Sequence, residues 1–187
     1  MDWRNARREK TYYNSKFNIY GYDPRSLGWI KGTQAIRFKN LTMAGDLDNC
    51  SILDVGCGFG DLYGYLSNTG AQVSYTGVDI NRNFIKTARE IYPKAQFIEA
   101  DFEKDIIPGK YDWAMASGIF NLKIDNNQAF IEHTLKKMYK LSKKGIVADF
   151  LRPKAACGCD GLYYQDPDKL LRFCDRLSRH VVFRDDY

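Results

Sequence analysis

A short stretch around residue 58 combines an apolar run with three glycines in close succession. Residues 51–62 read Ser-Ile-Leu-Asp-Val-Gly-Cys-Gly-Phe-Gly-Asp-Leu. The apolar half predicts a buried strand, and the pattern after the last glycine predicts the start of a helix. A strand that turns through glycines into a helix brings bare backbone and helix N–H groups close to a ligand. The stretch therefore predicts the binding loop of a nucleotide cofactor.

The spacing of the glycines separates two kinds of cofactor. A dinucleotide fold requires the pattern G-x-G-x-x-G, in which the last glycine lets the helix pack on the strand. Here Gly60 comes one residue early, and Asp61 stands where that pattern requires glycine. A carboxylate at this position would repel a pyrophosphate, whereas it suits the ammonium group of an amino acid. Asp54, before the first glycine, is also unusual for a phosphate site, so the loop disfavours a nicotinamide oxidoreductase.

Two further carboxylates follow predicted strands later in the chain. Residues 75–80 predict a second strand that carries Asp79, about 20 residues beyond the glycine loop, where an acid can accept hydrogen bonds from ribose hydroxyls. Residues 95–100 predict a third strand, followed directly by Asp101 and Phe102. Each acid alone is equally well explained as a polar residue at a strand end, but three acids in this order strengthen the prediction of a cofactor site.

The loop and these acids resemble the first motifs of the class I S-adenosylmethionine-dependent methyltransferases. The resemblance implies that the loop holds the methionine end of the cofactor and that Asp79 binds the ribose. It also implies that Asp101 contacts the adenine amino group while Phe102 packs on the ring. The alternative is a glycine-rich turn that binds nothing. The cofactor-binding residues expected in this part of the chain are Asp54, Gly56, Cys57, Gly58, Gly60, Asp61, Leu62, Asp79, Ile80, Asp101, Phe102, Ser117 and Gly118.

Length and composition indicate an ordinary globular protein. The 187 residues suffice for one domain with a core, and 44% hydrophobic with 27% charged residues is a usual balance. No apolar run approaches the ~18 residues of a membrane span, and the N-terminus lacks the apolar core of a signal peptide. These features predict a cytoplasmic protein with no membrane partner. The net charge of +5 is mild, so nucleic acid is an unlikely partner, although aromatic residues among the N-terminal basic ones leave that function open.

The cysteines indicate free thiols rather than a disulfide framework. Their number, five, is odd, and the chain shows no secretion signal. Cys157 and Cys159 could form a redox or metal pair. The sequence has only two histidines and no second cysteine pair, so no metal is predicted.

Apolar strands alternate with helical patterns along most of the chain. This order predicts an α/β fold with a Rossmann-like, open and mostly parallel sheet that carries helices on both faces. The resembled family completes its sheet with an antiparallel pair, but nothing after Arg184 is long enough for a seventh strand, so that pair is expected to be incomplete. An open sheet edge favours pairing of two copies. Strands are predicted at 51–55, 75–80, 95–100, 110–116, 146–150 and 180–184, and helices at 33–44, 61–68, 81–92, 127–144 and 168–177.

The N-terminal residues are expected to form a lid over the cofactor. Residues 12–38 mix aromatics with turn formers and lie outside the alternating pattern, so the chain is divided into a lid and helix at 1–44 and a core at 45–187. The Tyr-Tyr and Leu-Gly-Trp runs resemble those of small bacterial methyltransferases whose substrate is not assigned. Tyr13 and Trp29 would shield the sulfonium, or simply fill core. Arg37 would pair with the cofactor carboxylate, or remain a surface residue. The lid is expected to order when cofactor enters.

The loop after the fourth strand is expected to face the methyl group and its acceptor, because open parallel sheets bind ligands beyond the carboxyl ends of their strands. It begins Ser117-Gly118 and contains neither the Asn/Asp-Pro-Pro-Tyr/Phe run typical of amino-group methylation nor a Pro-Cys nucleophile. Asp149, His133 and several tyrosines are candidate bases by residue type, and no catalytic residue is assigned.

The sequence predicts an S-adenosylmethionine-dependent methyltransferase that acts on a small molecule. An RNA or protein methyltransferase and a non-catalytic cofactor-binding module remain as alternatives.

Overall fold

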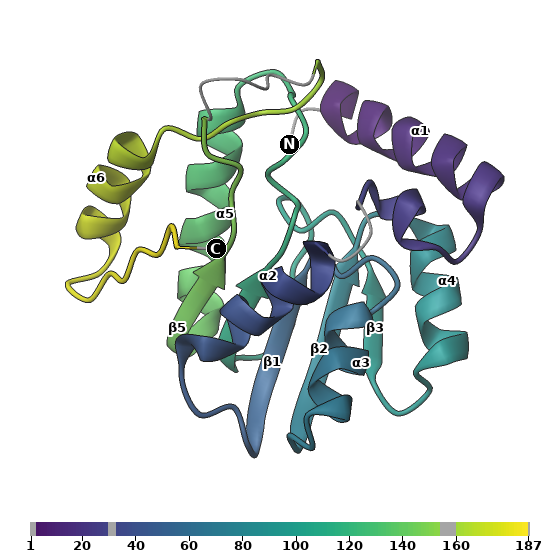
Figure 1. Ribbon diagram of the computed structural model, residues 1–187, viewed down its shortest axis with the longest axis horizontal. Helices are drawn as coiled ribbons and strands as arrows, with labels where there is room; N and C mark the ends of the chain where they lie inside the picture. Colours follow the sequence, from purple (N-terminus) through teal and green to yellow (C-terminus); the bar gives the residue numbers. More distant parts are fainter. Residues whose placement is uncertain (1–2, 30–32, 154–159, 187) are drawn as a thin grey trace.

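The computed structural model describes residues 3–29, 33–153 and 160–186, with side chains from residue 6 onward. These residues form one five-stranded sheet with helices on both faces (Figure 1). All neighbouring strands are parallel, in the order β3-β2-β1-β4-β5, so the prediction of a Rossmann-like parallel sheet is confirmed. The strands are β1 Cys50–Val55, β2 Val73–Asp79, β3 Gln96–Glu99, β4 Tyr111–Ala116 and β5 Ser142–Ala148.

Two apolar clusters lie on the two faces of the sheet. Successive side chains of a strand point to opposite faces, so Ile52 joins one cluster and its neighbour Leu53 joins the other. The Ile52 cluster contains side chains of α2, α3 and α4, and the Leu53 cluster contains those of α5 and α6. The helical segments are α1 Trp3–Tyr20, η1 Pro24–Leu27, α2 Thr33–Leu41, η2 Thr42–Ala44, α3 Asp61–Asn68, α4 Arg82–Ile91, α5 Asn127–Leu141 and α6 Pro167–Leu177.

The predicted elements are largely found, with two corrections near the C-terminus. Helix α5 ends at Leu141 rather than at residue 144, because Ser142 already pairs with Tyr111 and starts β5. The strand predicted at 180–184 is wrong. Residues 179–186 form no helix or strand, and Val182 is 88% exposed. A strand requires a partner for its backbone groups, and none of the described residues supplies one here.

Helix α1 is the element that sequence reasoning missed. It lies across the top of the sheet in Figure 1, on the side of α4. Phe17 packs on Phe59 and Phe84, with 5.9 Å between ring centroids in each pair, and the Asn14 side chain accepts a hydrogen bond from Asn81 at 3.0 Å. Aromatic and amide contacts therefore hold α1 against the glycine loop and the start of α4. The division into a lid at 1–44 and a core at 45–187 stays a prediction.

None of the helices among the described residues combines the length and the apolar character that crossing a membrane requires.

The contacts of Phe17 predict how strongly α1 is held. Phe17→Ala should lower the free energy of unfolding by about 2 kcal/mol, because a half-buried ring is worth less than the 3–5 kcal/mol of a buried one. Hydrogen exchange within α1 should accelerate more than exchange in the sheet. Urea unfolding and exchange mass spectrometry measure both. Ile19→Ala, on the same helix but 71% exposed, is the control and should change neither. Equal effects of the two substitutions would contradict this packing of α1.

Candidate active site

The glycine loop joins β1 to α3 at the centre of the sheet. Gly56, Gly58 and Gly60 all have positive φ angles, of 72°, 55° and 78°, a left-handed conformation that other residues rarely adopt. The amide groups of Gly56 and Cys57 donate to the carbonyl oxygen of Val78, at 2.8 and 3.1 Å, so the loop is tied to the end of β2. The glycine spacing is therefore required by backbone conformation, whatever the loop binds.

Asp79 connects this loop to the next helix. One carboxylate oxygen accepts from the Gly58 amide at 2.9 Å, and the other accepts from the Asn81 amide at 2.7 Å, just before α4. Burial raises the pKa of Asp79 to about 6, and these backbone donors oppose that rise. A carboxylate offers about four acceptor positions, so Asp79 can still accept from a ligand hydroxyl. The acid that the sequence predicted as a ribose contact thus lies directly beside the glycine loop.

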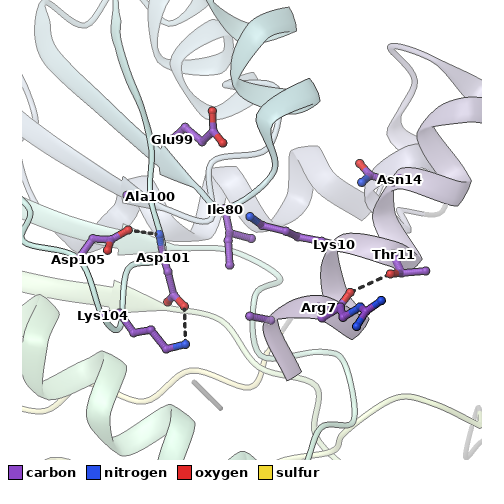
Figure 2. A pocket seen from close by; sticks show the side chains of 11 residues that line it. Arg7, Lys10, Thr11, Asn14, Ile80, Glu99, Ala100, Asp101, Lys104 and Asp105 are labelled. Carbon is purple, nitrogen blue, oxygen red and sulfur yellow. Dashed lines mark hydrogen bonds and ion pairs between the residues drawn. The ribbon is translucent and has the colours of Figure 1, made fainter. Parts of the chain in front are cut away.

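A pocket of about 470 Å³ opens between α1 and the ends of β2 and β3 (Figure 2). Ile80 and Asp101 line it from the sheet, and Lys10 reaches into it from α1. The Asp101 carboxylate accepts from the Glu103 amide at 3.0 Å and pairs with Lys104 at 3.8 Å. Phe102 is instead buried in the core cluster that contains Leu53, and it is not among the described residues that line the pocket.

Helix α1 adds an acid that sequence reasoning did not identify. Glu9 is half-buried, and burial together with the charges of Asp79 and Asp101 raises the pKa of Glu9 to about 8. Tyr13 lies one turn further on, beside Phe84 at 5.8 Å, and burial near Glu9 and Asp79 raises its pKa. No sequence signal pointed to Glu9, because the helix that carries it was not predicted. Glu9 thus lies close enough to Asp79 and Asp101 for both charges to act on it.

Three side chains, those of Tyr22, Leu27 and Gln34, cover the other end of the glycine loop. A Cβ atom placed on Gly58 would meet the Leu27 side chain at 2.9 Å, so Leu27 lies against the bare backbone. The Asp61 carboxylate, at the start of α3, accepts from the Tyr22 hydroxyl at 3.2 Å and from the Gln34 amide at 3.0 Å. Tyr22, Leu27 and Gln34 were missed, because their spacing in the sequence follows no helix or strand period.

A buried ion pair closes the site above β4 and β5. The Arg37 guanidinium donates to the Asp149 carboxylate at 2.7 Å, with side chains 15% and 1% exposed. The same carboxylate accepts from the Ser117 hydroxyl at 2.6 Å and from the Gly118 amide at 2.9 Å. Trp29 packs against Gly118 and faces the Arg37 guanidinium at 5.0 Å. Arg37, expected at the cofactor carboxylate, is here the partner of Asp149, and Trp29 covers this pair.

Other predicted residues lie beneath the loop rather than at its surface. Asp54 is buried and accepts from the Tyr75 hydroxyl at 2.5 Å, and burial raises the pKa of Asp54 to about 7. Burial also raises the pKa of the Cys57 thiol, which makes it an inert thiol at neutral pH. Leu62 is a core side chain of α3. These residues support the loop from below.

The remaining candidates lie elsewhere. His133 is an exposed residue of α5 that contacts Glu103 at 3.0 Å. Within the described ranges, no group of three or more metal-ligating side chains is found. Cys50, Cys57 and Cys174 are free thiols, whereas Cys157 and Cys159 lie outside the described residues.

Comparison with known proteins identifies the family of this chain. A family model described as a methyltransferase domain matches residues 52–145, which run from β1 to the start of β5. A protein of Mycobacterium tuberculosis named as a methyltransferase, Rv1506c, is 35% identical over 150 residues, covering 75% of this chain and 88% of the relative. A second relative named as a methyltransferase, 235L of Invertebrate iridescent virus 6, is 32% identical over 123 residues. That alignment covers 65% of this chain and 46% of the viral protein.

A solved structure shows the same fold. The magnesium protoporphyrin IX methyltransferase of Synechocystis, crystallised with bound S-adenosylmethionine, has the same fold at a TM-score of 0.67. Sequence identity is 16%, and the match covers 92% of this chain and 85% of that chain. The protein described here belongs to the class I S-adenosylmethionine-dependent methyltransferases.

The raised pKa of Glu9 predicts that the stability of the protein depends on pH. Because the pKa of Glu9 is about 8 in the folded protein and 4.5 ordinarily, the folded state binds more protons than the unfolded state between these values. The contribution of Glu9 to stability is therefore full below about pH 4.5 and is lost as the pH rises through about 8. Glu9→Gln should make the protein more stable than the parent at about pH 9 and bring the two closer at about pH 5.

Urea unfolding across this pH range measures the effect. Glu90→Gln, on an exposed position of α4, is the matched control and should follow the parent at every pH. A Glu9→Gln variant whose stability tracks the parent would show that Glu9 ionises without penalty beside Asp79.

Proposed function

We propose that this protein transfers a methyl group from S-adenosylmethionine to a small-molecule acceptor. The choice of a small-molecule acceptor rests on how the site is covered. The segments α1 and η1 lie across the glycine loop, with Leu27 against Gly58 and the Tyr22 hydroxyl hydrogen-bonded to Asp61. A site covered in this way favours a ligand that can be enclosed over one that must stay attached to a long chain. The cover thus favours a small molecule over an RNA or a protein side chain.

The cofactor residues follow from the contacts of the loop. Asp79 would accept hydrogen bonds from the ribose hydroxyls, and Asp101 would bind the adenine amino group in the pocket beside Ile80. The backbone from Gly56 to Gly60 would receive the methionine end, and Asp61 would pair with its ammonium group. The bare Gly58 backbone fits this role, because it leaves space beside it. Leu27 fills that space in this structure, and the methionine end of the cofactor would take its place. Leu27 must withdraw when the cofactor enters.

The chemistry asked of the chain is alignment and exclusion of water. The bound cofactor supplies a methyl group that is already activated by the sulfonium, so holding the acceptor in line accounts for much of the rate. Asp149 is held by Arg37, Ser117 and Gly118, which makes it a positioning residue for the loop after β4 rather than a base. The neighbour from Synechocystis, by its name, acts on magnesium protoporphyrin IX, and this supports an acceptor of small-molecule size.

The role of the glycine loop is tested by Gly58→Val. A branched side chain at this position would meet the ligand and the Leu27 side chain, so the variant should lose detectable binding of S-adenosylhomocysteine. Isothermal titration calorimetry measures the binding, and circular dichroism reports whether the domain folds. Gly70→Val is the matched control: it carries the same strain at φ 84° but has open space around it. Full affinity in a folded Gly58→Val variant would remove the loop from the site.

The role of Asp79 is tested separately. Asp79→Ala removes a charged acceptor, and a hydrogen bond to a charged group contributes about 1.5–3 kcal/mol. The dissociation constant for S-adenosylhomocysteine should therefore rise at least about tenfold. Glu99→Ala is the control, because Glu99 also lines the pocket but lies at its exposed side. An equal effect of the two substitutions would reduce Asp79 to a support for the loop.

The whole proposal is tested by methyl transfer itself. The protein is incubated with radiolabelled S-adenosylmethionine and three acceptor pools: a small-molecule extract, total RNA and undenatured protein. Label should enter the small-molecule pool, and the Gly58→Val variant should transfer none. Label in RNA or protein alone would favour those acceptors, and binding without transfer to any pool would favour a non-catalytic cofactor-binding module.

A further inference from the structure

A second pocket lies on the other side of α1. Its volume is about 580 Å³, within the range of ligand pockets, and it is bounded by α1, by residues 122–124 and by Gly161. Figure 1 shows the start of α1 close to the segment after β4 and to the one before α6. Leu122 bonds in an antiparallel bridge to Leu162, which joins these two segments into one wall. The pocket therefore stands beyond the end of β4.

The two pockets meet at one turn of α1. Arg7 and Thr11 line both of them, and the Thr11 hydroxyl donates to the Arg7 carbonyl oxygen at 2.9 Å within that turn. Glu9 lines the second pocket, yet the charges of Asp79 and Asp101 act on it across the helix. Only the thickness of α1 therefore separates the second pocket from the pocket at Asp101. A molecule in the second pocket would therefore lie across α1 from a ligand in the pocket at Asp101.

The described residues that line this pocket combine apolar side chains with positive charge. Leu122, Ile124 and the ring of Tyr12 form apolar wall, and Arg7, Arg8 and Lys123 bring positive charge. Arg8 pairs with Asp125 only at 3.9 Å, between side chains that are 67% and 73% exposed, so this pair is weak. Glu9 is held largely protonated near neutral pH by burial and by its acidic neighbours. The charge that a ligand would meet here is positive.

We infer that the second pocket binds an organic anion with an apolar body, such as an aromatic or aliphatic carboxylate. The apolar body lies against Leu122 and Ile124, and the anionic group pairs with Arg7, Arg8 or Lys123. A guanidinium suits this role because it donates two parallel hydrogen bonds to a carboxylate. This inference concerns a second ligand site and goes beyond the proposed function.

The experiment compares charged and uncharged probes of equal shape. Binding of 2-naphthoate and of 2-naphthalenemethanol is measured by calorimetry, with the protein saturated by S-adenosylhomocysteine, and decanoate and decanol form a second pair. Each carboxylate should bind at least about fivefold more tightly than its alcohol. The double variant Arg8→Gln/Lys123→Gln, whose two residues line only the second pocket, should lose most of that preference and keep its affinity for S-adenosylhomocysteine. The double variant Lys136→Gln/Lys140→Gln, which removes two exposed charges from α5, is the control and should keep the preference.

A second variant tests the apolar wall. Ile124→Glu should weaken every probe at least about fivefold, and a thermal melt by circular dichroism shows whether it folds. Equal affinity for carboxylate and alcohol, absence of carboxylate binding, or displacement of 2-naphthoate by S-adenosylhomocysteine would each overturn the inference. In those cases binding of S-adenosylhomocysteine alone still supports the proposed function. Failure of the parent to bind S-adenosylhomocysteine would instead overturn the proposed function itself.

Discussion

The carboxylate of Asp79 is the interaction on which the candidate site depends. Its two oxygens accept from the Gly58 and Asn81 amides, and it thereby joins the glycine loop, the end of β2 and the start of α4. A buried carboxylate is unfavourable unless hydrogen bonds satisfy it, and here the backbone donors do so. Because those donors belong to separate elements, their relative positions are defined before any ligand arrives. The site is preorganised around one charge.

Asp79 is one of several acidic side chains near the glycine loop. Together they make the site favourable for a positively charged ligand. Glu9, Asp54 and Asp61 all have their pKa values raised by burial, and Asp101 lies near Glu9. Like charges held together disfavour full ionisation of the group, so a positive ligand would relieve the repulsion. S-adenosylmethionine carries a sulfonium and an ammonium group. Its binding would thus compensate a cost that the folded protein bears without it.

Aromatic packing and hydrogen bonds hold α1 and the segment around η1 over the site. Phe17 packs on Phe59 and Phe84, and Tyr22 packs its ring on Phe59 at 5.1 Å while its hydroxyl donates to Asp61. Leu27 of η1 lies directly against Gly58, so it must move when a cofactor reaches this backbone. An opening at η1 would admit the cofactor while α1 keeps the wall that the two pockets share. The cofactor and a ligand of the second pocket would then enter by separate routes.

The sequence by itself determined the parallel sheet, the glycine loop and the acids at the strand ends. These features depend on local patterns: the left-handed backbone at positions 56, 58 and 60 requires glycine, and Asp79 is the last residue of its strand. Only the tertiary structure decided which side chains meet. Arg37 and Asp149 are 112 residues apart in sequence, and no pattern of spacing records their pairing. Glu9 and Leu27 reach the site through the packing of α1 and η1, and the segment at 180–184 forms no strand because no described neighbour pairs with it. Local periodicity defines an element, but contacts between distant elements follow from how their surfaces pack.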